Sequence, residues 1–185
     1  MKIPEQAKLV FKGIIYDVYQ WKQAQYDGST ATYEMLKRPN TLQIIAIKNN
    51  KILLIDEQQA GCPAATSFIG GRQEPDENPE QGAKRELLEE AGMVSNNWEL
   101  FQTYNPIDKI EWCVHVFIAK NAEIVSEPNL DPGEKISVKE LSFEEFSDFV
   151  LNGGLHSQEF VSEFRRWKIQ EPKKIEELKK KLGLV

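Results

Sequence analysis

Hydrophobic and polar residues alternate over much of the N-terminal half, which is the pattern of β-strands. The alternation in residues 9–33 is interrupted by the turn signal Asp27-Gly28 and predicts a β-hairpin arm. Two runs rich in Ile and Leu, residues 41–47 and 51–55, flank the turn pair Asn49-Asn50 and predict a second antiparallel hairpin, in the core. Further strands are expected at residues 67–69, 98–104 and 111–119.

The strongest helix signals surround residues 79–91. Asn78 suits the N-cap, Pro79 the first helical position and Gln81 the capping-box partner, and Gly92 can end the helix in a left-handed conformation. The strands, this helix and three later helices predict an α+β fold. The later helices are expected from the capping box at Ser142 to Gly153, over residues 157–167 and over residues 172–182.

Composition and charge narrow the class of protein. The chain has 185 residues, 41% of them hydrophobic and 28% charged, as in ordinary globular proteins. Its net charge of −6 leaves no basic footprint, so no nucleic acid partner is expected. No apolar run approaches the roughly 20 residues of a membrane-spanning helix, so no membrane partner is expected. The start of the chain lacks secretory signal features, and Cys62 and Cys113 suggest reduced thiols, which predicts a cytoplasmic location.

Three carboxylates share one face of the helix predicted at residues 79–91. Glu86, Glu89 and Glu90 are related by i, i+3 and i+4, so their side chains project close together. Such like charges repel, and the arrangement makes physical sense when Mg²⁺ or Mn²⁺ lies among them. The alternative is a solvated acidic face partnered by Lys84 and Arg85.

A wider spacing decides between these two interpretations. The pattern G-x5-E-x7-R-E-U-x-E-E-x-G-U, with U apolar, matches Gly71, Glu77, Arg85, Glu86, Leu87, Glu89, Glu90, Gly92 and Met93. This pattern resembles the Nudix box. The resemblance implies the Nudix fold, a mixed β-sheet sandwiched between helices, and hydrolysis of a nucleoside diphosphate linked to another moiety.

The resemblance also implies roles for the residues of the box. The glutamates Glu86, Glu89 and Glu90 are the expected metal ligands, with Glu89 and Glu90 also catalytic, and Mg²⁺ is the expected cofactor, with Mn²⁺ as a substitute. In the family a carbonyl at the glycine turn is a further ligand, which corresponds to Gly70 here. The residues expected to be structural are Gly71, Glu77, Arg85 and Gly92.

Residues outside the box resemble the ADP-ribose and nucleotide-sugar pyrophosphatase branch of the family. The similar segments include Phe11-Lys12-Gly13, Asp27-Gly28 and Lys37-Arg38-Pro39. The branch exchanges its N-terminal arm between two subunits, so the resemblance implies a homodimer; the alternative is an edge hairpin on a monomer. We therefore expect one arm (residues 1–40), a Nudix core (41–155) and a helical extension (156–185).

The arm also supplies candidate substrate contacts. Tyr33 stands where the branch often places an aromatic residue against the base, and Trp21 is a second candidate; either residue could instead serve packing. Arg38 is expected to meet a phosphate or an interface carboxylate.

A loop after the box carries a candidate catalytic base. Pro106 and Glu111 resemble the branch's S-P-G-x-x-x-E loop, whose glutamate is an extra ligand or the base. Asn105 and Ile107 depart from that pattern, so Asp108 is a competing base. The branch usually has Arg where Gln59 stands, which puts ADP-ribose itself in doubt as the substrate.

These features predict a metal-dependent hydrolase that cuts the pyrophosphate bond of an ADP-ribose-like or GDP-sugar-like nucleoside diphosphate sugar. The products would be a nucleoside monophosphate and a sugar phosphate. Two alternatives remain open: a nucleoside triphosphate or capped-RNA pyrophosphohydrolase, and a non-catalytic Nudix module that senses a nucleotide.

Overall fold

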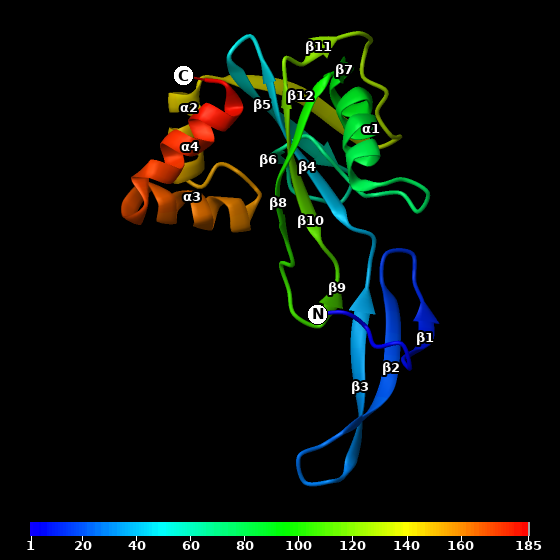
Figure 1. The fold of residues 1–185 in the computed structure, drawn as a ribbon. Coiled ribbons are helices and arrows are strands. Elements are labelled where there is room, and N and C mark those ends of the chain that lie inside the picture. Colours follow the sequence, from blue (N-terminus) through cyan, green and yellow to red (C-terminus); the bar gives the residue numbers. More distant parts are fainter. Residues whose placement is uncertain (185) are drawn as a thin grey trace.

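The computed structural model describes residues 1–184, and Figure 1 shows a layered body from which a narrow β-arm projects. The strands are β1 (Lys8–Lys12), β2 (Asp17–Ala24), β3 (Thr30–Lys37), β4 (Thr41–Lys48), β5 (Lys51–Gln59), β6 (Ala65–Ser67), β7 (Met93–Val94), β8 (Asn97–Tyr104), β9 (Ile110–Glu111), β10 (Val114–Lys120), β11 (Glu123–Ile124) and β12 (Glu134–Leu141). The helices are α1 (Pro79–Ala91), α2 (Phe143–Leu151), α3 (Gln158–Gln170) and α4 (Pro172–Leu182).

A mixed sheet forms the middle layer of the body. Its strand order is β12-β5-β4-β10-β8, with β6 added beside β5. Strands β4 and β10 run parallel, and the other neighbours run antiparallel. Helix α1 covers one face, and α2, α3 and α4 cover the other (Figure 1). This arrangement confirms the predicted α+β fold of a mixed sheet between helices.

The two faces of the sheet bury separate hydrophobic clusters because side chains alternate along each strand. On the α1 side, Leu42, Ile44 and Leu53 pack with Leu87 of the helix. On the other side, Ile45 and its neighbours pack with aromatic residues of α2 and α3. That aromatic group consists of Phe143, Phe146, Phe160, Phe164 and Trp167.

Helix α1 has the bounds that the sequence predicted, because its end signals are local. The Asn78 side chain accepts a hydrogen bond from the backbone N–H of Gln81, and the Gln81 side chain accepts one from that of Asn78. Gly92 ends the helix with φ of 63° and donates back to the last turn. The predicted turn at Asn49-Asn50 is also present, with both residues at positive φ.

The arm is larger than the hairpin predicted from the sequence. Strand β1 pairs with β2, which pairs with β3, and the short strand β9 adds in parallel beside β3. The segment predicted as one strand at residues 111–119 is therefore divided between β9 in the arm and β10 in the body. Strand β12 was not predicted, because polar residues interrupt its hydrophobic pattern.

The helices that cover the aromatic side of the sheet lie close to their predicted places. Helix α2 follows the capping box formed by Ser142 and Glu145, and α3 continues three residues beyond the predicted end at Trp167. No helix within residues 1–184 is long and apolar enough to cross a membrane.

Candidate active site

Helix α1 carries two buried carboxylates toward the glycine turn that precedes it. Glu86 and Glu90 are 8% and 9% exposed, whereas the side chain of Glu89 is 40% exposed. Leu87 of the same helix packs into the sheet, which fixes the direction in which its neighbours project. The structure therefore brings the three predicted glutamates to one end of the body.

The glycine turn approaches this helix closely. The backbone N–H of Gly70 donates to the Glu90 carboxylate at 2.8 Å. A Cβ atom at Gly71 would lie 2.8 Å from Oε1 of Glu86, and Gly70 adopts a φ of 143° that favours glycine. Gly71 thus leaves room for the Glu86 carboxylate, and Gly70 leaves room for the Leu42 carbonyl of β4.

Arg85 links the carboxylates to the loop that precedes α1. Its Nη2 and Nε donate to the two carboxylate oxygens of Glu77 at 2.8 Å and 3.2 Å, and its Nη1 donates to Glu86 and Glu89 at 2.8 Å each. Hydrogen bonding to Arg85 lowers the pKa of Glu77. Arg85 and Glu77 thus join α1 to the loop that precedes it.

Burial makes the two inner carboxylates costly to ionise in the protein alone. It raises the pKa of Glu90 to about 8, although the Gly70 N–H opposes that shift. Burial also raises the pKa of Glu86, although Arg85 opposes that shift. A divalent cation would offset this cost, and carboxylate oxygens are the donors that Mg²⁺ and Mn²⁺ prefer, so the residues fit such an ion.

The acidic side chains are not preassembled around one point. Among residues 1–184, no three His, Cys, Asp or Glu side chains form a group that could hold a metal ion as it stands. Arg85 Nη1 lies between Glu86 and Glu89 and donates a hydrogen bond to one carboxylate oxygen of each. Binding a cation therefore requires these carboxylates to turn from Arg85.

A cavity of about 540 Å³ opens over these groups. One side carries Arg38 and Arg72, and strands β5 and β12 contribute Glu57 and Glu134. The full lining is Arg38, Thr41, Glu57, Gln59, Gly70, Gly71, Arg72, Glu74, Arg85, Glu86, Glu89, Glu90, Asn129, Leu130, Asp131 and Glu134. Sequence reasoning missed Arg72, which directly follows the glycine turn, and it missed Asn129, Asp131 and Glu134, whose only local signal was the polar, proline-containing stretch before β12.

The segment that leads to β12 is tied to the end of α1. The carbonyl oxygen of Gly92 accepts hydrogen bonds from the N–H groups of Val125 and Ser126 at 2.8 Å and 3.2 Å. The N–H of Asn129 donates to the Glu89 carbonyl at 2.8 Å. These bonds bring residues 129–131 to the cavity that Glu89 also lines.

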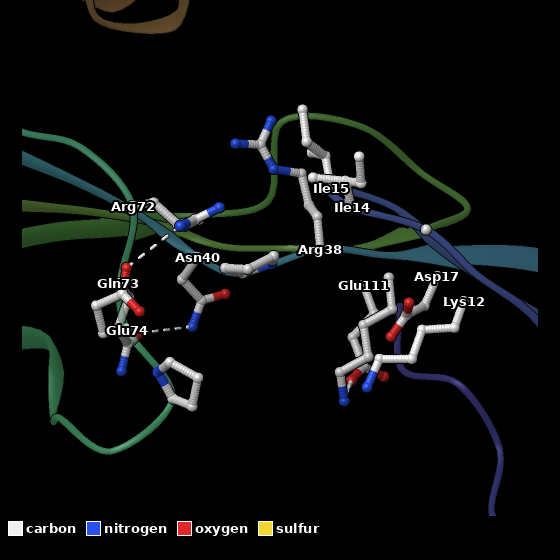
Figure 2. Close-up of a pocket in the computed structure, with 14 residues that line it drawn as sticks. Lys12, Ile14, Ile15, Asp17, Arg38, Asn40, Arg72, Gln73, Glu74 and Glu111 are labelled. Carbon is white, nitrogen blue, oxygen red and sulfur yellow. Dashed lines mark hydrogen bonds and ion pairs between the residues drawn. The ribbon is translucent and has the colours of Figure 1, made fainter. Parts of the chain in front are cut away.

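A second cavity, of about 590 Å³, lies between the arm and the body, and Arg38 and Arg72 line both cavities (Figure 2). The Arg38 guanidinium lies 4.5 Å from the Trp112 ring centroid and 5.6 Å from that of Tyr16. Its Nε is buried without a hydrogen-bond partner within residues 1–184. Arg38 is thus held by aromatic faces, and no carboxylate within that range forms an ion pair with it.

Glu111 lies in this second cavity and does not line the first. It pairs with Lys37 at 2.9 Å and accepts a hydrogen bond from the backbone N–H of Ile3 at 2.7 Å. Asp108 is exposed in the preceding turn and lines neither cavity. The structure thus separates both candidate bases from the glutamates of α1.

Trp21 and Tyr33 also lie away from the two cavities. They face each other across strands β2 and β3, with ring centroids 6.0 Å apart. Tyr33 is 42% exposed. Within one chain these aromatic residues form a cross-strand pair, so a role in binding substrate requires a second chain.

Comparisons with known proteins agree with this architecture. The NUDIX domain family matches residues 37–164. An ADP-ribose pyrophosphatase from Bacillus subtilis (strain 168) is 27% identical over 142 residues, covering 74% of this chain and 76% of that protein. A methanol dehydrogenase activator from Bacillus methanolicus is 26% identical over 154 residues, covering 78% and 80% of the two chains.

A solved structure supports the same assignment at the level of the fold. The crystal structure of an ADP compounds hydrolase superimposes with a TM-score of 0.74 at 18% identity, covering 98% of this chain and 95% of that one. The predicted resemblance is therefore confirmed by the domain match and by the fold. The chain belongs to the NUDIX family.

Proposed function

We propose that this Nudix hydrolase cleaves the pyrophosphate bond of a nucleoside diphosphate sugar to a nucleoside monophosphate and a sugar phosphate. The observation that carries the proposal is the pair of buried carboxylates, Glu86 and Glu90, in a cavity that Arg38 and Arg72 also line. Buried carboxyl groups and arginine side chains in one cavity suit a substrate held through a metal and through arginine.

Glu86, Glu90 and the Gly70 carbonyl are the groups that would hold Mg²⁺, or Mn²⁺ in its place, with Glu89 as a further ligand. Such an ion supplies a Lewis acid for the phosphates and lowers the pKa of bound water. Arg85 limits the positions that Glu86 and Glu89 can take, and its bonds to Glu77 fix Arg85 itself.

The remaining groups bind the substrate and move the proton. Arg38 and Arg72 can contact phosphate oxygens, because their guanidinium groups suit phosphate geometry. Glu89, the most exposed of the three glutamates, can accept a proton from water. Glu90 assists Glu89 in this step. Glu111 could act as the base only after leaving Lys37 and Ile3.

The arm supports a homodimer in which residues 1–40 meet a second copy. Large hydrophobic side chains of the arm are exposed to solvent in the single chain, at fractions of 62% for Phe11 and 97% for Ile14. A second copy would cover them and could bring Trp21 and Tyr33 to a substrate. Residues 41–155 would then form the catalytic core and residues 156–185 its helical extension. We also propose a cytoplasmic location, which the two free cysteines support.

The test is an assay of the purified chain with Mg²⁺, with and without EDTA, on ADP-ribose, GDP-mannose, UDP-glucose and nucleoside triphosphates. We expect a nucleoside monophosphate and a sugar phosphate from at least one nucleotide sugar, identified by mass, and no turnover in EDTA. Release of inorganic pyrophosphate from triphosphates alone would contradict the proposal. Tight nucleotide binding without turnover would indicate a sensing module instead.

A further inference from the structure

Asn40 lies where the chain passes from the arm to the body. It follows Pro39 between β3 and β4, and Cys113 lies between β9 of the arm and β10 of the body. The side-chain Oδ1 of Asn40 accepts a hydrogen bond from the backbone N–H of Cys113 at 2.9 Å. The backbone N–H of Thr41 donates to the Cys113 carbonyl oxygen, also at 2.9 Å. Two connections between the arm and the body are therefore bonded to each other at Asn40.

The same side chain reaches the loop that leads from the glycine turn to α1. Asn40 Nδ2 donates to Oε1 of Gln73 at 3.0 Å (Figure 2), and the backbone N–H of Gln73 donates to the Asn40 carbonyl oxygen at 2.9 Å. Gln73 Nε2 donates to the Glu77 carbonyl oxygen at 2.8 Å, which closes the loop of residues 73–77. We call the two partly buried side chains of Asn40 and Gln73 the amide bridge.

The groups at its two ends fix the direction of the hydrogen bonds in the amide bridge. The backbone N–H of Cys113 can only donate, so it must meet the Asn40 oxygen, which leaves the Asn40 nitrogen for Gln73. The Glu77 carbonyl can only accept, so it must meet the Gln73 nitrogen, which leaves the Gln73 oxygen for Asn40. Two amides in series satisfy both ends. A single carboxylate or apolar side chain at either position would leave a polar group without its partner.

The loop that the amide bridge closes holds Arg85. This arginine donates to the Glu77 carboxylate through Nε and Nη2, and Nη2 also donates to the Arg72 carbonyl oxygen at 3.0 Å. Its Nη1 donates to Glu86 and Glu89 at 2.8 Å each. A connected set of contacts therefore runs from the junction of arm and body, through the amide bridge, Glu77 and Arg85, to two glutamates of α1.

These contacts deepen the proposed function, on which the inference rests. We propose that the amide bridge positions the glutamates of α1 to receive the divalent cation, because it fixes the loop that holds Glu77 and, through Glu77, Arg85. The place of Arg85 determines how far Glu86 and Glu89 must turn to bind a cation. Replacing the groups that orient metal ligands changes metal affinity or activity by roughly 10- to 100-fold in other proteins. Asn40 and Gln73 are thus positioning residues, which act through Arg85.

Gln73→Met tests this role, because it removes both side-chain hydrogen bonds of Gln73 and adds no charge. We expect the dissociation constant of Mn²⁺, measured by electron paramagnetic resonance on the whole chain, to rise about tenfold. The Mg²⁺ concentration that gives half-maximal turnover should rise by the same factor. Gln170→Met, at the exposed end of α3, is the matched control and should leave both values within about twofold of the original.

A structural role alone would give a different result. Gln73→Met would then unfold at a lower temperature, and the folded chain would bind Mn²⁺ with its original affinity. That outcome would overturn the inference.

The fixed direction of the hydrogen bonds gives a second test. Asn40→Asp sets an oxygen against the Gln73 oxygen, and Gln73→Lys sets an ammonium group against the Asn40 nitrogen. Each substitution alone should weaken Mn²⁺ binding at least about fivefold, and the two together should bring it back to within about threefold of the original. The ammonium group can then donate to both the new carboxylate and the Glu77 carbonyl. Additive losses in the double variant would overturn the inference.

Binding of Mn²⁺ separates this inference from the proposed function, because it needs no substrate. The expected changes in Mn²⁺ affinity without hydrolysis of any nucleotide sugar would sustain the positioning role and overturn the activity. Hydrolysis by a protein whose Mn²⁺ affinity does not respond to these substitutions would sustain the activity and overturn the positioning role. A chain that binds no Mn²⁺ would overturn both.

Discussion

The hairpin of β4 and β5 and the hairpin of β2 and β3 are built alike and have different surroundings. In the first, residues such as Ile44 and Leu53 are fully buried between helices. In the second, Tyr33 is 42% exposed, and in the neighbouring part of the arm Ile14 is 97% exposed. Hydrophobic side chains therefore specify strands in both hairpins, but only the hairpin of the body is covered by its own chain. The proposed homodimer would cover the arm with a second chain.

In the body, carboxyl groups are buried, and Glu90→Gln tests most directly whether the proposed activity needs them. The substitution keeps the shape and removes the anion, so we expect kcat to fall roughly 10²- to 10⁴-fold, about 3–5 kcal/mol of barrier. Turnover is measured on the best nucleotide sugar of the panel, and circular dichroism should show an unchanged fold. Activity at the original rate would show that Glu90 holds no essential metal.

The pH dependence of stability also tests the burial of Glu90 in the body. Because the pKa of Glu90 is raised to about 8 in the folded chain, the folded state binds more protons than the unfolded state between about pH 4.5 and 8. The free energy of unfolding should therefore fall as pH rises through this window, by up to about 1.4 kcal/mol per pH unit. Urea unfolding without metal measures it.

Two controls accompany the pH experiment. Glu90→Gln should lose most of this slope, because its side chain does not titrate. Saturating Mg²⁺ should flatten the slope as well, because a bound cation favours the ionised carboxylate. A slope that persists unchanged in Glu90→Gln would assign it to other groups.

Gly82 tests how tightly the body is packed around α1. Alanine in a helix is ordinarily favoured over glycine by about 1 kcal/mol. A Cβ at Gly82, however, would overlap the Glu77 carboxylate and the Leu42 side chain. We expect Gly82→Ala to lower the free energy of unfolding by about 1–3 kcal/mol. Chemical denaturation measures the change, and an increase in stability would show that Glu77 and Leu42 move aside freely.

Ile14→Lys tests whether the exposed hydrophobic side chains of the arm form a dimer interface. A lysine costs little in a single chain at a site that is 97% exposed, but it would place a charge in the interface of a dimer. We expect the dimer dissociation constant to rise about tenfold or more, close to 1.4 kcal/mol. Sedimentation equilibrium measures it. Ile169→Lys, on α3 at 80% exposure, is the matched control and should leave association unchanged.

Local signals made α1 predictable, whereas the cavity depends on contacts between distant segments. Asn78, Gln81 and Gly92 fix the helix within a few residues of themselves, so its bounds and its glutamates followed from the sequence. Gln59 meets Glu134 only through the register of β5 and β12, 75 positions apart, which no local pattern encodes.

The candidate base illustrates the same difference. Family resemblance singled out Glu111, but its orientation is decided by Ile3 and Lys37, residues more than 70 positions away in the sequence. Trp21 and Tyr33 were predicted to touch substrate, and in one chain they touch each other. Their role in substrate binding remains a prediction about the assembled dimer.

The hydrogen bonds from Val125, Ser126 and Asn129 to the end of α1 have a consequence for how this protein can change. The segment that supplies Asp131 is attached to the same helix that carries Glu86, Glu89 and Glu90. New side chains at positions 129–131, which line the cavity, would therefore lie near these glutamates. Single substitutions in this segment could change the substrate preference while the glutamates of α1 keep their positions.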